Sequence, residues 1–357
     1  MKFFLAPMQG LTGYTVRNAF HHHFDYIDKY YTPFIPAAKR MNAKIKRDID
    51  PVNNDGITLI PQAMSIVADE VIDLHRQPVP YGYDEINVNL GCPSGTVVSK
   101  KRGSGILAYP DMLDSFLDDL YTKADFPVSI KTRVGFNDDE LWPRLIEIYS
   151  KYPISELTVH PRVQKDFYKN TPRMDDFALA MQKINPDKTI LCYNGDITDI
   201  NSFNALTDCF PDIDEIMIGR GLFANPALIA ELKGISMDKA ELRERLKNWH
   251  DEILSGYLSI FSGVSATPSM IPSTYPLIAV IGVLRSWEIL LISSLFSFSM
   301  RFFSSVDSFR RRRISSKSWQ SWENSSFPST SSTKSRFPSL MFLVAFLSFT
   351  SGTAILL

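Results

Sequence analysis

The chain has 357 residues, a length that suits two domains, or one barrel of about 250 residues with an extension. Its three cysteines, Cys92, Cys192 and Cys209, have no C-x-x-C spacing, which excludes a disulfide framework and a four-cysteine zinc or iron–sulfur centre and indicates a reducing compartment. Only three of the 39 acidic residues but nine of the 38 basic residues follow residue 261. The net charge is therefore −7 for residues 1–261 and +6 for the rest of the chain. A nucleic acid that binds the acidic part must contact local basic patches.

The chain begins with a short apolar run, Phe3 to Ala6, that is too brief for the core of a signal peptide. We therefore predict a strand there, no secretion and a cytoplasmic protein. Strand and helix patterns then alternate at the spacing of βα units. The strands are expected at 3–6, 26–31, 58–63, 85–89, 128–132, 156–160, 189–193 and 215–218, and the helices at 12–22, 68–76, 110–123, 140–149, 175–184, 200–210 and 225–233. This alternation predicts an α/β protein whose residues 1–235 form a (β/α)₈ TIM barrel.

Polar and glycine residues follow every predicted strand. They are Pro7-Met8, Tyr31-Thr32, Gln62, Asn89 with Cys92, Lys131 with Arg133, His160 with Arg162, Asn194-Gly195-Asp196, and Gly219-Arg220-Gly221. In a barrel of this kind the carboxyl ends of the strands meet at one rim, where active sites lie. The sequence therefore predicts a single site built from these segments.

The segment from Glu85 to Leu107 holds the residue with the most distinctive chemistry. Its strand pattern stops at Gly91-Cys92-Pro93, since proline cannot continue a ladder, and this places Cys92 at the mouth of the sheet before a glycine-rich loop. The alternative is a small buried hydrophobic cysteine, which is the interpretation we give to Cys192 and Cys209.

Two short motifs after the last two strands suit a phosphate. Asn194-Gly195-Asp196 and Gly219-Arg220-Gly221 bring backbone N–H groups and a guanidinium to the place where barrels bind phosphoryl groups. Each motif alone is also a common turn, so their joint position carries the prediction.

A family resemblance runs through these same segments, from Ala6 to Pro226. The chain resembles the tRNA-dihydrouridine synthases, which use FMN and electrons from NADPH to reduce a uridine of tRNA. The motifs are A-P-M at 6–8, Q-A-M at 62–64, N-L-G-C-P at 89–93, S-I-K-T-R at 129–133, L-T-V-H-P-R at 157–162, Y-N-G-D-I at 193–197 and M-I-G-R-G at 217–221. N-L-G-C-P is the most specific of them, and other flavin barrels share the phosphate motifs. NADPH is implied by the resemblance alone, because no G-x-G-x-x-G fingerprint follows a strand.

The resemblance implies a role for Cys92 and for the residues around a bound flavin. Cys92 matches the proton donor to C5 of the uracil, and an ordinary thiol is protonated at neutral pH. Lys131 matches a lysine beside the flavin, and the alternative is an ordinary surface lysine. His160 matches a cofactor-contacting histidine, and the alternative is a hydrogen-bonded core histidine. The remaining matches are Gln62 at the flavin ring edge, Pro7 and Met8 along the ring, Asn89 on the uracil or the flavin, and Asn194, Gly195, Asp196, Gly219 and Arg220 at the phosphate.

A base inside folded RNA must leave its stack to reach a flavin, which requires an open rim with nearby cations. We expect five basic residues to contact RNA phosphates or the target nucleotide: Lys100, Lys101, Arg102, Arg133 and Arg162. The run His21-His22-His23 points around a helix in three directions and is interpreted as solvated, so no metal site is predicted.

The family appends a helical domain that grips tRNA, and residues 236–261 have the pattern of its first helix, with Asp238 as a cap. Residues 262–357 form a serine-rich tail without family resemblance. A membrane anchor is disfavoured because Arg285 and Glu288 interrupt the apolar stretch at 275–300. We therefore expect no stable membrane association. A disordered RNA-binding tail around Arg310–Arg313 is the second interpretation. We favour a third, a change of reading frame or a junction in the gene near Ser262.

Two other functions stay open at this level. One is a flavin barrel that reduces a free pyrimidine, which the absence of a helical RNA platform would favour. The other is a flavin-binding or RNA-binding protein that has lost turnover through its altered C-terminus. The patterns carry no signal for the oligomeric state.

Overall fold

The computed structural model describes residues 1–38 and 40–262. The predictions for the tail after Ser262 lie outside the described residues. Within them, ten parallel strand segments form one sheet in the order β3-β5-β6-β7-β8-β9-β10-β1-β2-β4. The strands are β1 (Lys2–Leu5), β2 (Lys29–Tyr31), β3 (Ile35–Pro36), β4 (Leu59–Ile60), β5 (Gln62–Met64), β6 (Ile86–Leu90), β7 (Val128–Gly135), β8 (Glu156–Val163), β9 (Ile190–Tyr193) and β10 (Glu215–Ile218).

The sheet closes on itself through residues 59–64. β2 pairs with β4 and β5 pairs with β6, while only Pro61 separates β4 from β5. Proline has no N–H to give to a ladder, yet its carbonyl still accepts from the Asn87 N–H at 2.9 Å. Counting β2 with β3, and β4 with β5, as interrupted strands gives eight strand positions. The predicted (β/α)₈ barrel is therefore confirmed, with each strand within a few residues of its predicted place.

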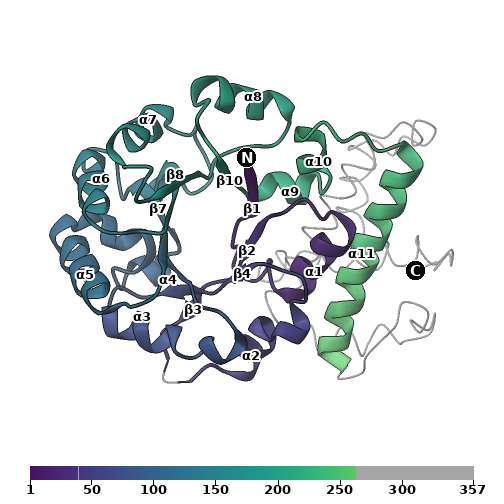
Figure 1. Cartoon of the computed structure of the whole chain (residues 1–357), viewed down its shortest axis with the longest axis horizontal. Helices are drawn as coiled ribbons and strands as arrows, with labels where there is room; N and C mark the ends of the chain where they lie inside the picture. The colour runs from purple at the N-terminus through teal and green to yellow at the C-terminus, as the bar shows by residue number, and fades with distance from the viewer. Residues whose placement is uncertain (39, 263–357) are drawn as a thin grey trace, which may run out of the picture. The chain divides into compact units, whose positions relative to one another are not determined.

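The helices surround this ring of strands, and in Figure 1 α3, α5, α6, α7 and α8 lie outside the sheet. Their amphipathic faces supply the core, as in α6, where Trp142, Leu145, Ile146 and Tyr149 are all buried. The helices are α1 (Tyr14–His23), α2 (Ala43–Ile49), α3 (Ala68–His75), α4 (Gly95–Val98), α5 (Pro110–Lys123), α6 (Trp142–Lys151), α7 (Met174–Lys183), α8 (Ile200–Cys209), α9 (Arg220–Ala224), α10 (Leu228–Leu232) and α11 (Lys239–Ser262).

The last helix, α11, begins where the sequence places its cap. The Asp238 carboxylate accepts from the N–H groups of Ala240 and Glu241, both at 2.8 Å. α11 then runs beside α1, as Figure 1 shows. The centroids of the Phe20 ring in α1 and the Trp249 ring in α11 lie 5.3 Å apart.

A histidine pair of α1 also contacts α11. His22 and His23 each place a ring nitrogen within 2.9 Å of the Glu252 carboxylate, while His21 lies 3.0 Å from Asp25, just after the end of α1. His22 and His23 therefore take part in the contact between the two helices, beyond the solvated role that the sequence indicates.

The interior of the barrel is polar at the amino ends of its strands. The buried Glu156 carboxylate accepts from Lys29 Nζ, the Tyr31 hydroxyl and Thr158 Oγ1, each at 2.7 Å. This network spans several strands, so a buried charge is held by complete hydrogen bonding. None of the helices that the structure describes combines the length and the apolar character that a membrane crossing requires.

Candidate active site

The carboxyl ends of the strands bring the predicted site residues to one rim. Asn89 at the end of β6 is directly opposite Lys131 of β7, and Arg133 of β7 is opposite His160 of β8. Asn194 follows β9, and Gly219 follows β10, which pairs with β1. Because all these strands are parallel, residues as far apart in the sequence as Asn89 and Gly219 meet at one end of the barrel.

A chain of side-chain amides crosses the strands below this rim. Asn89 Nδ2 donates to Gln62 Oε1 at 2.8 Å, Gln62 Nε2 donates to Asn87 Oδ1 at 2.8 Å, and Asn87 Nδ2 donates to Ser129 Oγ at 2.9 Å. All four residues are buried. The chain fixes the side chains of Gln62 and Asn89, two of the predicted contacts, and it includes Asn87, which the sequence analysis did not single out.

Asn89 also supports the loop that holds the thiol. Its Oδ1 accepts from the backbone N–H groups of Gly91 at 3.0 Å and Cys92 at 2.9 Å. On the other side, the Cys92 carbonyl accepts from the Ser104 N–H at 3.1 Å and the Ser104 hydroxyl at 2.8 Å. Cys92 is thus held by backbone contacts before and after it.

The Cys92 side chain is half-buried and Cys192 is buried as predicted, whereas the prediction of a buried Cys209 is wrong, because this residue ends α8 and is exposed. Burial raises the pKa of the thiol above its ordinary value, and this effect outweighs the opposing influence of the Ser94 backbone N–H and the Arg133 charge. A thiol with a raised pKa keeps its proton at neutral pH, which suits a proton donor and does not suit a nucleophile.

Lys131 and Asn194 form the next contact along the rim. Lys131 Nζ donates to Asn194 Oδ1 at 2.5 Å, and Asn194 Nδ2 donates to the Met217 carbonyl at 2.8 Å. Burial lowers the pKa of Lys131 to about 7, and the Arg133 charge acts in the same direction. Lys131 is therefore not an ordinary surface lysine, because its ammonium points into the mouth of the barrel.

His160 lies within a group of cations. Burial and the charges of Arg133, Lys131, Arg162 and Arg220 lower its pKa well below the usual range, so the imidazole is neutral. Its Nε2 lies 3.2 Å from Arg162 Nη1, which donates to it.

A single carboxylate, that of Asp196, joins two of these arginines. It pairs with both Arg162 and Arg220. Burial alone raises the pKa of Asp196, but the hydrogen bonds and charges of the two arginines outweigh burial and lower it. Asp196 therefore positions the half-exposed Arg220 guanidinium at the rim.

The glycines of the two predicted phosphate motifs allow close approach of the backbone. A Cβ on Gly195 would lie 2.0 Å from the Tyr193 hydroxyl oxygen, so a side chain cannot fit there. A Cβ on Gly219 would lie 3.3 Å from the Ala6 Cβ and 3.7 Å from Met8 Sδ. Gly219 therefore packs against Met8, and Pro7, the residue before Met8, follows β1 at the same rim.

The five basic residues predicted to contact RNA fall into different environments. Lys100 and Lys101 are exposed, and the Lys101 ammonium lies 4.3 Å from the Tyr109 ring centroid. Arg102 pairs with Glu70 at 2.9 Å.

Arg133 and Arg162 are buried, and backbone carbonyls take up much of their donor capacity. Arg133 donates to Gly91, Val163 and Phe167 oxygens at 3.0, 2.9 and 2.7 Å, and Arg162 Nε donates to Lys169 and Asn170 oxygens at 3.0 and 3.1 Å. The structure therefore brings these two arginines to the rim without exposing them as free surface cations.

Sequence reasoning missed Tyr168, which lies in the loop between β8 and α7. Its half-exposed ring has the Arg220 guanidinium at 5.1 Å and the Arg133 guanidinium at 5.7 Å from its centroid. The only available signal was an aromatic pair, Phe167-Tyr168, in a loop that follows a site-bearing strand.

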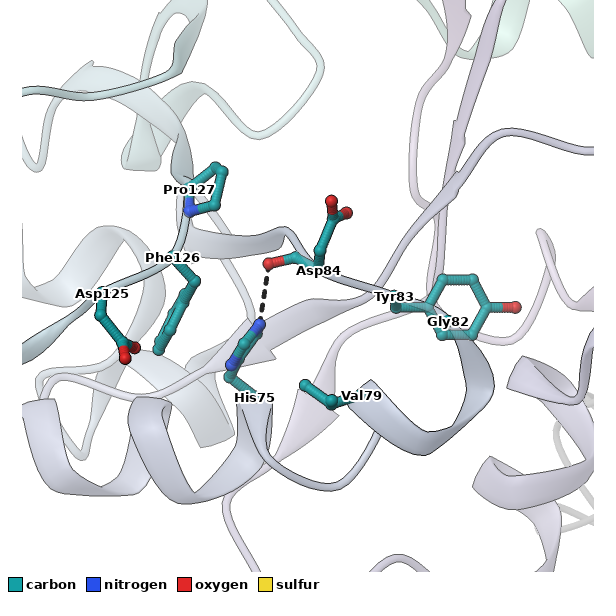
Figure 2. Close-up of a pocket in the computed structure, with 8 residues that line it drawn as sticks. All are labelled: His75, Val79, Gly82, Tyr83, Asp84, Asp125, Phe126 and Pro127. Carbon is teal, nitrogen blue, oxygen red and sulfur yellow. Dashed lines mark hydrogen bonds between the residues drawn. The ribbon is translucent and has the colours of Figure 1, made fainter.

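A hollow of about 440 Å³ lies at the opposite end of the barrel. His75, Asp84, Phe126 and Pro127 are among its lining residues, and Figure 2 shows the His75 ring stacked on Phe126 and hydrogen-bonded to the Asp84 carbonyl. These segments end α3 and precede β6 and β7, so the hollow is far from the rim that carries Cys92. It is not part of the candidate active site.

The fold and the rim define a (β/α)₈-barrel enzyme with a half-buried thiol near Arg133 and a group of cations around His160. A family model described as "Dihydrouridine synthase (Dus)" matches residues 4–255. The chain therefore belongs to the dihydrouridine synthase family.

Several curated relatives carry the same family name. The "tRNA-dihydrouridine synthase B" of Pasteurella multocida (strain Pm70) is 26% identical over 243 residues, which cover 66% of this chain and 69% of the relative. The "Probable tRNA-dihydrouridine synthase" of Staphylococcus aureus (strain Mu50) is 34% identical over 149 residues, 41% of this chain and 44% of the relative. The matched part thus spans about two thirds of the first relative and less than half of the second.

Solved structures with a similar fold include a variant of NCR from Zymomonas mobilis and morphinone reductase. They are 11% and 10% identical, each with a TM-score of 0.46, and they cover 70% and 68% of this chain and 90% and 88% of theirs.

Proposed function

We propose that this protein reduces uridine to 5,6-dihydrouridine in tRNA, with FMN as the bound cofactor and NADPH as the electron donor. The observation that supports this most strongly is the meeting, at one rim, of a protonated thiol, a partly buried lysine and a glycine-lined cationic cluster, in a member of the dihydrouridine synthase family.

The charges at the rim suit an anionic cofactor. Four cations, Lys131, Arg133, Arg162 and Arg220, act on His160, whereas Asp196 is the carboxylate that pairs with two of them. The phosphate of FMN would lie against Gly195, Gly219 and Arg220, where small residues let backbone N–H groups approach an anion. Lys131, Gln62, Pro7 and Met8 would hold the flavin ring.

The reduction needs a hydride at C6 of the uracil and a proton at C5, and bound FMN supplies the hydride. Cys92 supplies the proton: its S–H bond breaks as the new C–H bond forms, and the thiolate then takes a proton from water. The raised pKa keeps the thiol protonated beforehand, and the contacts of Asn89 and Ser104 hold it in place. The amide chain would present Asn89 to the base.

The other rim residues hold the cofactor and the RNA. Lys131 would place a positive charge beside the flavin, while neutral His160 offers a hydrogen bond without adding charge. Exposed Lys100 and Lys101, on the loop after Cys92, are the residues best placed to contact phosphates of an RNA whose target base has left its stack. We further propose that residues 236–261 begin the domain that grips tRNA, and that the reaction takes place in the cytoplasm.

The test uses purified full-length protein. We expect yellow FMN absorbance and formation of dihydrouridine in tRNA from a strain that lacks its own synthases. Cys92→Ala should retain FMN but lose at least about 100-fold in kcat. Reduction of free uracil or uridine with no reaction on tRNA would replace the proposal with a small-molecule reductase, and FMN binding without turnover of either substrate would contradict it.

A further inference from the structure

The loop that follows Cys92 is tied to the barrel by a charged side chain. Arg102 Nη2 donates to both carboxylate oxygens of Glu70, at 2.9 Å and 3.3 Å. Glu70 lies in the first turn of α3 and also accepts a hydrogen bond from the Ser65 hydroxyl. Ser65 is fully buried and directly follows β5, the strand that carries Gln62. Arg102 is therefore linked to the barrel wall next to the candidate site.

The residues immediately after Arg102 transmit this link to the thiol. Gly103 adopts a left-handed conformation (φ 55°) and packs so closely that a Cβ there would lie 2.8 Å from the Cys92 carbonyl oxygen and 3.0 Å from the Cys92 Cβ. Ser104 donates to the Cys92 carbonyl through both its N–H and its hydroxyl. A displacement of Arg102 would therefore move the backbone contacts that hold Cys92.

The environment of Arg102 differs from that of its basic neighbours. Lys100 and Lys101 are exposed, but the Arg102 side chain is only 26% exposed and its charge faces the Glu70 carboxylate. A guanidinium already paired with a carboxylate gains less from an RNA phosphate than a free cation does, because the existing pair must first be broken.

We propose that Arg102 and Glu70 are positioning residues that set the place of the Cys92 thiol above the barrel, and that Arg102 does not act as an RNA contact. This inference rests on the proposed role of Cys92 as proton donor. The pair acts through Gly103 and Ser104 and touches neither the substrate nor the cofactor.

The test compares Glu70→Gln, Arg102→Gln and the double variant with the charge-swapped variant Glu70→Arg/Arg102→Glu. We expect each single variant to lower kcat about tenfold, with KM for tRNA and FMN content unchanged. The double variant should be no worse than the singles, and the swapped pair should restore much of kcat. Arg76→Gln is the matched control, because Arg76 also belongs to the α3 segment but pairs only at the surface, with Asp73.

A second readout does not depend on turnover. In a Cys209→Ala background, which removes the exposed cysteine, we expect iodoacetamide to alkylate Cys92 several-fold faster in the single variants, because a loosened loop exposes the half-buried thiol. Arg76→Gln should react at the wild-type rate.

Two outcomes would overturn the inference. One is an Arg102→Gln enzyme with raised KM for tRNA and a weaker salt dependence, alongside a Glu70→Gln enzyme without either change, since that pattern marks a phosphate contact. Lys101→Gln provides the reference for such a contact. The other is unchanged kcat and unchanged alkylation in both single variants. If wild-type protein forms no dihydrouridine, the proposed function fails, and the alkylation rates still decide whether the pair positions Cys92.

Discussion

The two ends of the barrel carry opposite charge. At the carboxyl end, Lys131, Arg133, Arg162 and Arg220 surround His160, and Asp196 pairs with two of them, Arg162 and Arg220. At the amino end, three carboxylates, those of Glu85, Glu156 and Glu215, surround Lys29, and Lys2 pairs with Glu215 at 3.2 Å. The same eight strands thus end in an excess of cations on one side and an excess of acids on the other.

The proton affinities of the two ends follow this difference. At the cationic end, burial and like charges lower the pKa values of Lys131 and His160. At the acidic end, burial and the neighbouring Glu156 raise the pKa of Glu215, and the surrounding carboxylates raise that of Lys29 in spite of its burial. An anion brought to the carboxyl end relieves repulsion among cations, whereas at the amino end Lys29 is already paired with Glu156 and Lys2 with Glu215. The comparison predicts that substitutions at the amino end affect stability and those at the carboxyl end affect binding.

The largest effect is expected for Lys29→Met at the amino end. Glu156 is buried, and loss of its ion pair with Lys29 leaves a carboxylate inside the barrel without its counter-charge. We expect the free energy of unfolding to fall by about 3 kcal/mol, measured by urea denaturation. The folded protein should bind FMN as the wild type does. A weakened FMN complex without loss of stability would break the comparison.

The next effect is expected for Lys131→Met at the opposite end. This change removes the ammonium that lies at the mouth of the barrel, where the flavin is proposed to bind. We expect FMN affinity to fall by about 2 kcal/mol, roughly 30-fold, in a titration followed by flavin fluorescence. Stability without FMN should stay the same or rise, because a partly buried, repelled charge has been removed. A loss of stability comparable to that of Lys29→Met would contradict this division of roles.

The smallest effect is a pH dependence of FMN binding. The pKa of Lys131 is lowered to about 7 in the protein without cofactor, so Lys131 loses its proton as the pH rises through that value. An anionic ligand favours the protonated form of Lys131. At a pH above the pKa of Lys131, binding of the anion must therefore be accompanied by uptake of a proton. Between about pH 7.5 and 9, affinity should fall by at most about tenfold per pH unit. The same slope in Lys131→Met would show that another group causes it.

Much of the fold was predictable because its signals are local. All eight strand positions follow from short β-type runs between helical patterns, and the cap at Asp238 follows from residue type. The break between β4 and β5 at Pro61 is a finer detail, as are the extra short helix α9 and the shortening of the expected helix at 225–233 to α10. They depend on how the strands and loops close around one another, which no short pattern contains.

The positions of the candidate site residues could be predicted from the sequence, but their burial and hydrogen-bond partners could not. Strand ends located Cys92, Lys131 and His160 correctly at one rim. The burial of Arg133 could not be predicted, because the carbonyls that accept its hydrogen bonds belong to distant segments, Gly91 on one side and Val163 and Phe167 on the other. The pairing of Arg102 with Glu70, 32 positions away, was hidden for the same reason.

The side-chain amides beneath the rim donate and accept in a fixed order along the chain, and the loop that carries Cys92 determines that order. Asn89 must turn its oxygen toward the N–H groups of Gly91 and Cys92, and this orients Gln62 and then Asn87, whose NH₂ ends at the Ser129 hydroxyl. If the loop moves away from Asn89, the Asn89 amide can exchange the positions of its oxygen and its NH₂ group. The amides of Gln62 and Asn87 can then do the same in turn. The orientation of these amides therefore depends on whether the loop contacts Asn89. Side-chain amide NMR signals of Gln62, on the neighbouring strand β5, and of Asn87, on the same strand as Asn89, would report that contact.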